Sequence, residues 1–339
     1  MSIIYIMKFI SLFSLLSVVS GNILSNLFEK WALEYNYNVY DNYAILFEKW
    51  VSNHKFIEET NAKNLTYSLG HNQFSAMDLH DFRAYLGYNS IEQNDEKLFF
   101  ENSQYGLRGS LLESVNWVER GGVTPVKDQG KCGSCWSFST TGALEGAYFV
   151  KNGVLFSFSE QQLVSCDNFK NIENRGHDHG CSGGLMDNAF GWIEKNNGLC
   201  SEIEYPYVSG EGVVPVCSYE CDEVKGSKIV NFVDVKPSDD TAMMTAISKQ
   251  PVSIAIEADQ REFQLYKSGI FTGDCGTKLD HGVLVVGYGA ENGNDYYLVK
   301  NSWSESWGDA GYIKLGRGPN YNNGDGQCGI LLQGSYPVL

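Results

Sequence analysis

Positive charge is scarce in this sequence. Of its 339 residues, 25 are lysine or arginine and 41 are aspartate or glutamate, which gives a formal net charge of −16. A surface of that sign repels phosphate, so nucleic acid and anionic membranes are not expected partners. No internal repeat or low-complexity tract is present, and the C-terminal SYPVL carries no retention tetrapeptide.

Long apolar runs are also missing after the first twenty residues. Lys8 precedes an apolar run from Phe9 to Val19, which is short for a membrane span. We therefore expect residues 1–20 to be a signal peptide cleaved before Gly21, so that the chain enters the secretory pathway. A signal anchor is the alternative, because Ile3 to Met7 extends the apolar stretch on the other side of Lys8.

Cysteine and proline are absent from Gly21 to Ser110, whereas all nine cysteines lie further along. The first part instead carries apolar residues at helical spacing, which predicts two amphipathic helices. These residues are Phe28, Trp31, Ala32 and Tyr35 for the first helix, and Phe47, Trp50, Val51, His54 and Ile57 for the second. Nine cysteines in a secretory chain predict disulfides plus one free thiol.

The stretch QGKCGSCWSFS, residues 129–139, contains the candidate free thiol. Cys135 lies where a glycine-rich loop gives way to a predicted helix. A helix N-terminus presents unpaired N–H groups that favour a thiolate, which is the nucleophilic form. Because a helix end contributes only about 0.3–1 kcal/mol, a second group must help, and a histidine is expected.

Three separated motifs carry a family resemblance. CGSCW at 132–136 is followed by His281 in KLDHGVLVVGYG and by Asn301 in YLVKNSWSESWGDAGY, the order seen in papain and cathepsin proteases. The chain resembles a papain-like cysteine protease preproenzyme of the cathepsin L type over essentially its whole length. Each residue alone would more often be structural, and their joint occurrence favours catalysis.

The resemblance implies an α+β fold of two lobes. Residues 21–110 would form a helical inhibitory prosegment, and residues 111–339 the mature peptidase. A helical lobe would reach to about residue 219, followed by an antiparallel β-barrel-like lobe. Strand-like runs at Pro251–Ile256, Gly282–Tyr288 and Asp295–Lys300 agree with this division, and the thiol and its base would face each other across a cleft.

The resemblance also assigns catalytic roles. Cys135 would be the nucleophile, and His281 would hold its proton as imidazolium before passing it to the leaving amine. Asn301 would orient the imidazole, with Trp303 covering that contact. Gln129 would donate its amide to the oxyanion beside the Cys135 backbone N–H. Asp280 would either tune the ion pair or be a solvated loop carboxylate.

Substrate contacts follow from the same resemblance. Gly183 and Gly184 would pair with an extended substrate backbone, and an apolar pocket would take the second residue on the acyl side of the cut. Its expected lining is Leu185, Met186, Ala255, Leu279 and Gly282, with Gln333 at the base. Asp280 and Trp303 are expected to contact substrate elsewhere in the cleft. No carboxylate is expected there, so Leu, Phe or Val should be preferred over Arg. No occluding insertion is evident, which favours an endopeptidase.

Disulfide pairing is likewise implied by the family. The expected bridges are Cys132–Cys181, Cys166–Cys217 and Cys275–Cys328, and a fourth between the two remaining cysteines, Cys200–Cys221. Cys217 and Cys221 could exchange partners.

The sequence departs from the family at three places. In the prosegment motif E-x3-R-x3-F-x2-N-x3-I-x3-N, Asn42 and Leu46 replace the Glu and Arg, and Ala76 replaces the Asp of the motif that follows. Ser304 replaces the first Gly of NSWGxxWG, which would add strain if that position needs a positive φ. The only glycosylation sequon, at Asn64, lies in the prosegment.

The remaining histidines give no metal signature. His177 and His179, in a segment that resembles an insertion, are expected to lie in a solvated loop, and no metal or cofactor is expected. His54, His71 and His80 could sense pH during release of the prosegment, although ordinary surface histidines are favoured.

The most favoured function is a monomeric secreted or lysosome/vacuole-type cysteine endopeptidase made as a zymogen. Its expected partners are polypeptide substrates, its own prosegment and cystatin-like inhibitors. Two alternatives stay open: a catalytically dead homologue acting as a binding protein, and an enzyme that transfers an acyl group to an acceptor other than water.

Overall fold

Helix α4 (Cys135–Asn152) is the element on which both halves of the molecule pack. Its side chains are buried continuously from Cys135 to Ala147. Gly142 and Gly146 let the helix approach closely, because a Cβ on either would come within 3 Å of Leu284 or Pro251. The helix ends at Gly153, whose φ of 72° gives a left-handed C-cap. This computed structural model describes residues 23–88, 111–169, 177–218 and 220–339.

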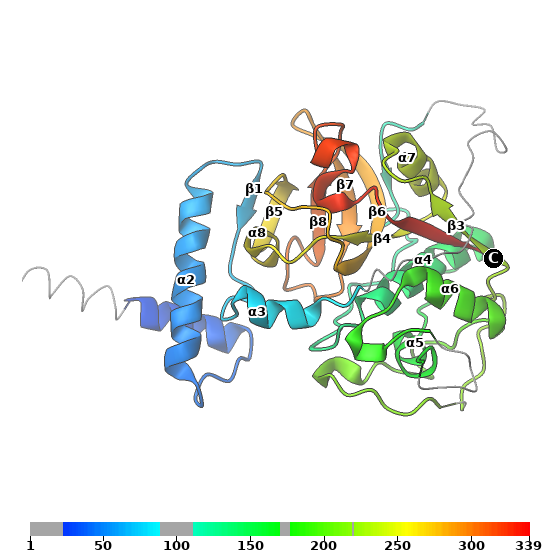
Figure 1. The fold of residues 1–339 in the computed structure, drawn as a ribbon, viewed down its shortest axis with the longest axis horizontal. Helices are drawn as coiled ribbons and strands as arrows, with labels where there is room; N and C mark the ends of the chain where they lie inside the picture. Colours follow the sequence, from blue (N-terminus) through cyan, green and yellow to red (C-terminus); the bar gives the residue numbers. More distant parts are fainter. Residues whose placement is uncertain (1–22, 89–110, 170–176, 219) are drawn as a thin grey trace, which may run out of the picture.

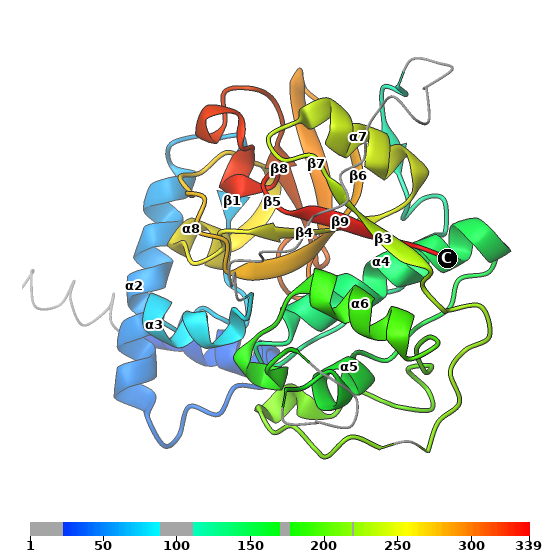
Figure 2. The ribbon, with the colours of Figure 1, turned by 45° about the vertical axis from the view of Figure 1, so that its right-hand side comes forward.

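The helical lobe packs on one side of α4 (Figures 1 and 2). It contains α5 (Glu160–Cys166) and α6 (Met186–Lys195). Helix α5 is capped by the Ser159 hydroxyl, which accepts from the Gln162 N–H at 3.0 Å. Three disulfides cross this lobe, so its loops are held covalently.

The second lobe is a sheet whose strands pack on the other side of α4. Its strand order, including one strand from the N-terminal segment, is β1-β5-β8-β7-β6-β4-β9-β3, with β2 also paired to β6. All pairs are antiparallel except β5–β8. The strands are β1 (Tyr67–Leu69), β2 (Val115–Asn116), β3 (Asn231–Val235), β4 (Val252–Ile256), β5 (Tyr266–Phe271), β6 (His281–Glu291), β7 (Asn294–Lys300), β8 (Tyr312–Gly316) and β9 (Gly334–Val338), and the helices α7 (Asp240–Lys249) and α8 (Arg261–Gln264) accompany them.

The N-terminal segment, residues 23–88, lies against the edge of the sheet and reaches the helical lobe (Figure 1). It contains a helix over residues 23–34, α2 (Tyr43–Asn61), strand β1 and α3 (Leu79–Phe82). Phe28, Trp31 and Trp50 form its own buried aromatic cluster, and β1 pairs with β5. Both helices expected from the apolar spacing are present. The expected signal peptide and the end of the expected prosegment, residues 89–110, fall outside the described residues.

The α+β, two-lobe expectation is confirmed, with the predicted strands appearing as β4, β6 and β7. Within the described part of the chain, no helix has the length and apolar character needed to cross a bilayer.

Candidate active site

Cys135 is the first residue of α4 and is completely buried. It is the free thiol among the nine cysteines. The loop before it is fixed by the Cys132–Cys181 disulfide. From the other lobe, Gly282 donates its backbone N–H to Cys135 Sγ at 3.3 Å. The thiol therefore lies at the junction of the two lobes, directly beside the backbone that carries His281.

His281 begins β6 and is held by two partners. Its Nε2 lies 2.8 Å from Asn301 Oδ1, and its ring stacks on Trp303 with centroids 4.4 Å apart and an interplanar angle of 19°. Nδ1 is buried and has no nitrogen or oxygen partner in the described part of the chain. An imidazole fixed through one nitrogen leaves the other available for proton transfer.

In this covered state the thiol and the imidazole are both neutral. Burial raises the pKa of Cys135 to about 11, although the N–H groups of Gly282, Gly87 and Trp136 oppose the rise. Burial also lowers the pKa of His281 to about 4, with Asn301 opposing. The thiolate expected at the helix end is therefore absent here, because desolvation disfavours both charged forms.

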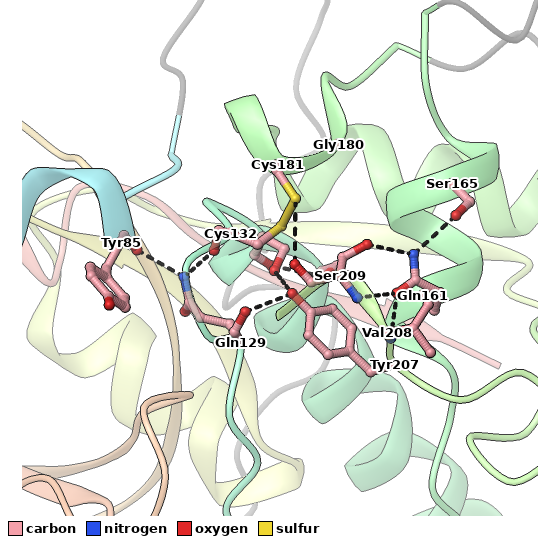
Figure 3. The surroundings of a disulfide bond; sticks show 12 residues. Tyr85, Gln129, Cys132, Gln161, Ser165, Gly180, Cys181, Tyr207, Val208 and Ser209 are labelled. Carbon is pink, nitrogen blue, oxygen red and sulfur yellow. Dashed lines mark hydrogen bonds between the residues drawn. A yellow bond between two sulfur atoms is a disulfide. The ribbon is translucent and has the colours of Figure 1, made fainter. Parts of the chain in front are cut away.

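Gln129 is held with its amide toward the N-terminal segment (Figure 3). Its Oε1 accepts from the Ser302 hydroxyl at 2.7 Å, which fixes the amide orientation. Its Nε2 donates to the carbonyls of Cys132 and Tyr85, both at 2.8 Å. The donor expected to bind an oxyanion is thus occupied by a backbone carbonyl of the N-terminal segment.

The N-terminal segment crosses the site from one lobe to the other. Gly87 accepts from the Gly184 N–H at 3.0 Å, and Tyr88 donates its N–H to the Asp280 carbonyl at 3.0 Å. Tyr88 and Gly184 form a parallel bridge. A Cβ on Gly87 would lie 1.9 Å from the Gly133 carbonyl oxygen, so only glycine fits there. Sequence reasoning did not single out Tyr85, Gly87 or Tyr88.

The expected apolar pocket is partly assembled. Ala255 and Gly282 are paired across β4 and β6, and a Cβ on Gly282 would lie 3.2 Å from Met186 Sδ. The Ala255 N–H donates to the Gln333 carbonyl at 3.0 Å. Leu185 is buried at the N-cap of α6, whereas Leu279 packs against the Gly329 turn.

A carboxylate lies next to Gln333, the residue expected at the base of this pocket. Gln333 Nε2 donates to Asp187 Oδ2 at 3.0 Å, and Asp187 is buried. Asp187 lies in the first turn of α6, directly after Met186, so its position in LMDNAF was the available signal. The carboxylate is engaged by the carboxamide.

Asp280 is not a solvated loop carboxylate. Its Oδ1 accepts from the Ala258 N–H at 2.8 Å. Burial raises its pKa to about 7, helped by Asp259 and Glu257, against the opposing N–H groups of Ala258 and Asp259. Asp280 therefore holds the loop before His281 and presents its carbonyl to the cleft.

A buried charge network lies behind the catalytic residues. Lys127 pairs with Glu160 at 2.6 Å and Glu145 at 3.3 Å. Lys300, the residue before Asn301, donates to the Thr124 hydroxyl at 2.9 Å, and burial lowers its pKa to about 8. These polar contacts tie the end of β7, and so the position of Asn301, to the loop before α4.

The N-terminal segment is anchored by its motif asparagines. Asn53 donates to the carbonyls of Ser75 and Met77 and accepts from Arg261 Nε. Asn72 donates to the Gln264 carbonyl at 2.8 Å. Phe74 and Phe82 pack edge-on against Trp303. The segment thus stays docked without the motif charges replaced by Asn42, Leu46 and Ala76.

Two histidines of this segment are not ordinary surface residues. His54 Nδ1 lies 3.0 Å from His71 Nε2, and both rings stack on Trp50, with centroids 5.0 and 4.4 Å away. Burial lowers the pKa of His71 to about 4, helped by His54 and Lys267. His80, in contrast, is exposed.

The structure joins the cysteines in the four expected pairs, including Cys200–Cys221. Ser304 has a φ of 64°, so its position does require the left-handed region. Asn64 is exposed, as a glycan acceptor must be. His177 is exposed, and the ring of His179 contacts that of Phe169 at a tilt of 55°, while residues 170–176 of that loop lie outside the described residues.

Comparison with known proteins identifies the family. A sequence profile described as papain family cysteine protease matches residues 111–338. The chain belongs to this family. The Arabidopsis thaliana proteins RD21C (probable cysteine protease) and XCP2 (cysteine protease) are each 42% identical to it, over 92% and 93% of this chain. It spans 67% of RD21C and 86% of XCP2, but 61% of cysteine proteinase RD21A.

Solved papain-family proforms match the whole arrangement. The proform of the ragweed pollen cysteine protease Amb a 11 has a TM-score of 0.82 at 34% identity, covering 93% of this chain and 94% of that one. Procathepsin L 3 of Tenebrio molitor has a TM-score of 0.80 at 35% identity, covering 93% and 99%. The cathepsin L-type expectation is therefore confirmed at the level of the family and the fold.

Proposed function

We propose that this papain-family protease is an endopeptidase made as a zymogen, in which Cys135 attacks the peptide carbonyl and His281 moves the proton. The observation that carries the proposal is the docked Tyr85 carbonyl on Gln129 Nε2. It lies beside a thiol contacted by Gly282 and a histidine fixed by Asn301. A carbonyl bound in this position is what a scissile peptide would present.

The mechanism follows from these contacts once the segment leaves. Water returns to the cleft, which removes the desolvation that keeps both groups neutral, and the Cys135 proton moves to His281. The thiolate attacks the carbonyl carbon, and Gln129 Nε2 with the Cys135 N–H binds the oxyanion. His281 gives its proton to the leaving amine, and then deprotonates the water that hydrolyses the thioester.

Residues 23–88 would act as the inhibitory part of a prosegment spanning residues 21–110, with residues 1–20 a signal peptide and residues 111–339 the peptidase. The backbone contacts of Gly87 and Tyr88 support this role, because the Gly87 carbonyl occupies the Gly184 N–H that would hold a substrate and Tyr88 binds the Asp280 carbonyl on the other lobe. The His54–His71 pair gives release a physical cause, since protonating both rings places two like charges 3.0 Å apart.

A secretory route to a lysosome, vacuole or the cell exterior fits the four disulfides of the lobes. One relative, 38% identical, is described as a KDEL-tailed cysteine endopeptidase. We assign this chain to the secretory pathway, without a choice among its destinations.

For specificity, we propose that Leu, Phe or Val is preferred over Arg as the second residue on the acyl side. Met186, Ala255 and Gly282 offer apolar atoms, and the Asp187 carboxylate is engaged by Gln333. Cleavage profiling with a peptide library tests this, and a profile led by Arg would contradict it. Gln333→Ala should increase the relative use of Arg about three- to tenfold, because the carboxylate loses its partner.

Acid activation of the full chain tests the central proposal. Wild-type protein brought to pH 4–5 should shorten to a product beginning near Leu111 and should cleave a fluorogenic dipeptide with Leu or Phe before Arg. Cys135→Ala should remain full length and inactive, and iodoacetamide should label Cys135 only after activation. A wild-type product that is processed but neither cleaves peptides nor reacts at Cys135 would refute the assignment. Adding a free amine and analysing the products distinguishes hydrolysis from acyl transfer.

A further inference from the structure

Two aspartates are completely enclosed in the helical lobe, away from the catalytic pair. Asp167 follows the last residue of α5, and Asp178 lies in the loop that leads to Cys181; their exposed fractions are 0% and 1%. Both are next to disulfide-bonded cysteines or within three residues of one. Carboxylates are rarely buried without a cation, so each of these two carboxyl groups needs hydrogen-bond donors or a proton to be stable there.

Each carboxyl group has one satisfied oxygen. Asp167 Oδ1 accepts from the His177 N–H at 2.9 Å. Asp178 Oδ1 accepts from the Leu185 N–H and from Asn188 Nδ2, both at 3.0 Å. The Oδ2 atoms of both residues are buried and have no donor among the described residues. The segments that carry them are paired, because Asn168 and Asp178 form a parallel bridge and the Phe169 N–H donates to the Asp178 carbonyl at 2.9 Å. The two carboxyl groups are therefore close enough for each to influence the pKa of the other.

Two carboxylates offer only acceptors, so a hydrogen bond between them requires a proton. Burial raises the pKa of Asp167 to about 6 and that of Asp178 well above its ordinary value, and the negative charge of Asp167 adds to the rise at Asp178. Among the described residues, the charged or titratable groups around the pair are Lys195 on α6, which favours ionised Asp167, and His177 and His179 in the loop. The pair titrates as a unit rather than as two independent acids.

Asp178 lies directly behind the strand expected to bind substrate. A Cβ on Gly184 would come within 2.7 Å of Asp178 Cγ, so the carboxyl group packs on the backbone of that glycine. The residue after Asp178 donates its N–H to the Gly183 carbonyl at 2.9 Å. Asp178 thus positions Gly183 to Leu185, although nothing in the cleft touches its carboxyl group.

We propose that Asp167 and Asp178 share one proton, and that this proton holds the Gly183–Leu185 strand in its substrate-binding position only in acid. The pKa values of both aspartates are higher in the folded protein than in the unfolded chain. The shared proton therefore stabilises the folded lobe fully below about pH 4, and this stabilisation is lost as the pH rises through about 6. Above that range two buried carboxylates repel each other, and the strand loses its support. Asp178 is a positioning residue, and only its kinetic consequence rests on the proposed peptidase function.

Asp178→Asn tests the proposal, because an amide keeps the acceptor for Leu185 and supplies a permanent donor to Asp167. In wild-type mature enzyme, KM for the Leu-Arg fluorogenic dipeptide should rise about tenfold between pH 5 and 7.5. In Asp178→Asn, KM should change less than twofold between the same two pH values. Asp167→Asn should behave in the same way. Asp178→Leu should raise KM at every pH, because leucine cannot accept from Leu185.

Glu194→Gln, an exposed carboxylate on α6, is the matched control and should keep the wild-type pH dependence. Infrared difference spectra of the full chain carrying Cys135→Ala provide a readout independent of activity. At pH 5, the spectrum of that protein minus the spectrum of its Asp178→Asn derivative should contain the carbonyl band of a protonated carboxylic acid, which disappears near neutral pH. Absence of this band overturns the shared proton, and superimposable KM profiles for wild type and Asp178→Asn overturn the positioning role. An inactive enzyme with the band present would refute the peptidase assignment alone.

Discussion

The N-terminal segment and the two-lobed part are stabilised by different means. Residues 23–88 contain no cysteine and dock through aromatic packing, motif asparagines and the short strand β1. The lobes are crossed by four disulfides. A segment without covalent cross-links can dissociate while the lobes remain intact, which is the behaviour that a releasable inhibitor needs.

The two regions also respond oppositely to pH. Each contains a close pair of like titratable groups, His54 with His71 and Asp167 with Asp178. The lowered pKa of His71 makes the docked segment less stable as the pH falls, whereas the raised pKa values of the aspartates favour the lobe in acid. If both proposals hold, acid weakens the docking of the N-terminal segment and supports the Gly183–Leu185 segment.

The largest effect is expected at the Gln129 side-chain amide, which is proposed to bind the oxyanion during catalysis and which binds the Tyr85 carbonyl of the docked segment. Gln129→Ala removes the donor for both the oxyanion and the Tyr85 carbonyl. We expect kcat/KM of the mature enzyme to fall about 10²- to 10³-fold, or about 2.7–4 kcal/mol. Docking of the segment should weaken by only about 1 kcal/mol, the usual net value of one hydrogen bond.

Steady-state kinetics measure the first effect, and hydrogen exchange of α2 in the Cys135→Ala full chain measures the second. Gln250→Ala, which removes a contact to the Pro337 carbonyl far along the sheet, should change neither. Equal losses in both assays would show that substrate and segment use the amide alike.

His71→Phe should uncouple docking from acid while keeping a ring against Trp50. A fall in the pKa of His71 from 6.5 to about 4 corresponds to about 3 kcal/mol of stability of the folded, docked segment, lost as the pH falls through that range. Activation of the variant at pH 4.5 should therefore be slower, by up to about 10²-fold. Time courses of processing at pH 4.5 and 6.5 provide the measurement.

The exposed His80 offers the control, since His80→Phe should activate like wild type. If His71→Phe activated at the wild-type rate at both pH values, another group would have to carry the acid response.

Removing the Cys200–Cys221 disulfide should affect the lobes alone. The bridge closes a loop of 21 residues, and loop-closure entropy gives about 3 kcal/mol for that length. Chemical unfolding of the double Cys→Ser variant at pH 5 should show a loss of that size. The pH dependence of segment release should not change, and a change there would break the separation between the two regions.

Local patterns were sufficient to predict several helices and strands and the residues of the candidate site. Apolar spacing identified the two prosegment helices, and the strand runs appeared as β4, β6 and β7. Gln129, Cys135, His281 and Asn301 were found because the family motifs name them. The structure brings them together from two loops, the start of helix α4 and the start of strand β6.

Features that depend on pairing between distant segments were not predicted. The Tyr85 carbonyl on Gln129 is a backbone contact, so no side-chain type announces it. The His54–His71 pair requires α2 and the following loop to meet on Trp50. Asp167 and Asp178 are eleven positions apart and close only after a disulfide-bounded loop folds. The rise in the pKa of the Cys135 thiol was not predicted either, because desolvation of a thiol depends on which segments of the folded chain cover it.

Ser304→Gly should give the smallest effect, confined to the lobes. Ser304 has a φ of 64°, a conformation that costs a non-glycine residue about 1–2 kcal/mol. Glycine removes this cost and so stabilises the folded protein. The greater freedom of glycine in the unfolded chain offsets about 0.4–1 kcal/mol of that stabilisation, so the free energy of unfolding should rise by about 0.5 kcal/mol. Ser304→Ala keeps the strained φ and should give no gain. The Ser304 N–H donates to the Lys127 carbonyl within the lobes, so docking of the N-terminal segment should be unchanged. If Ser304→Ala stabilised the protein as much as Ser304→Gly, loss of the hydroxyl and not relief of the backbone would be the cause.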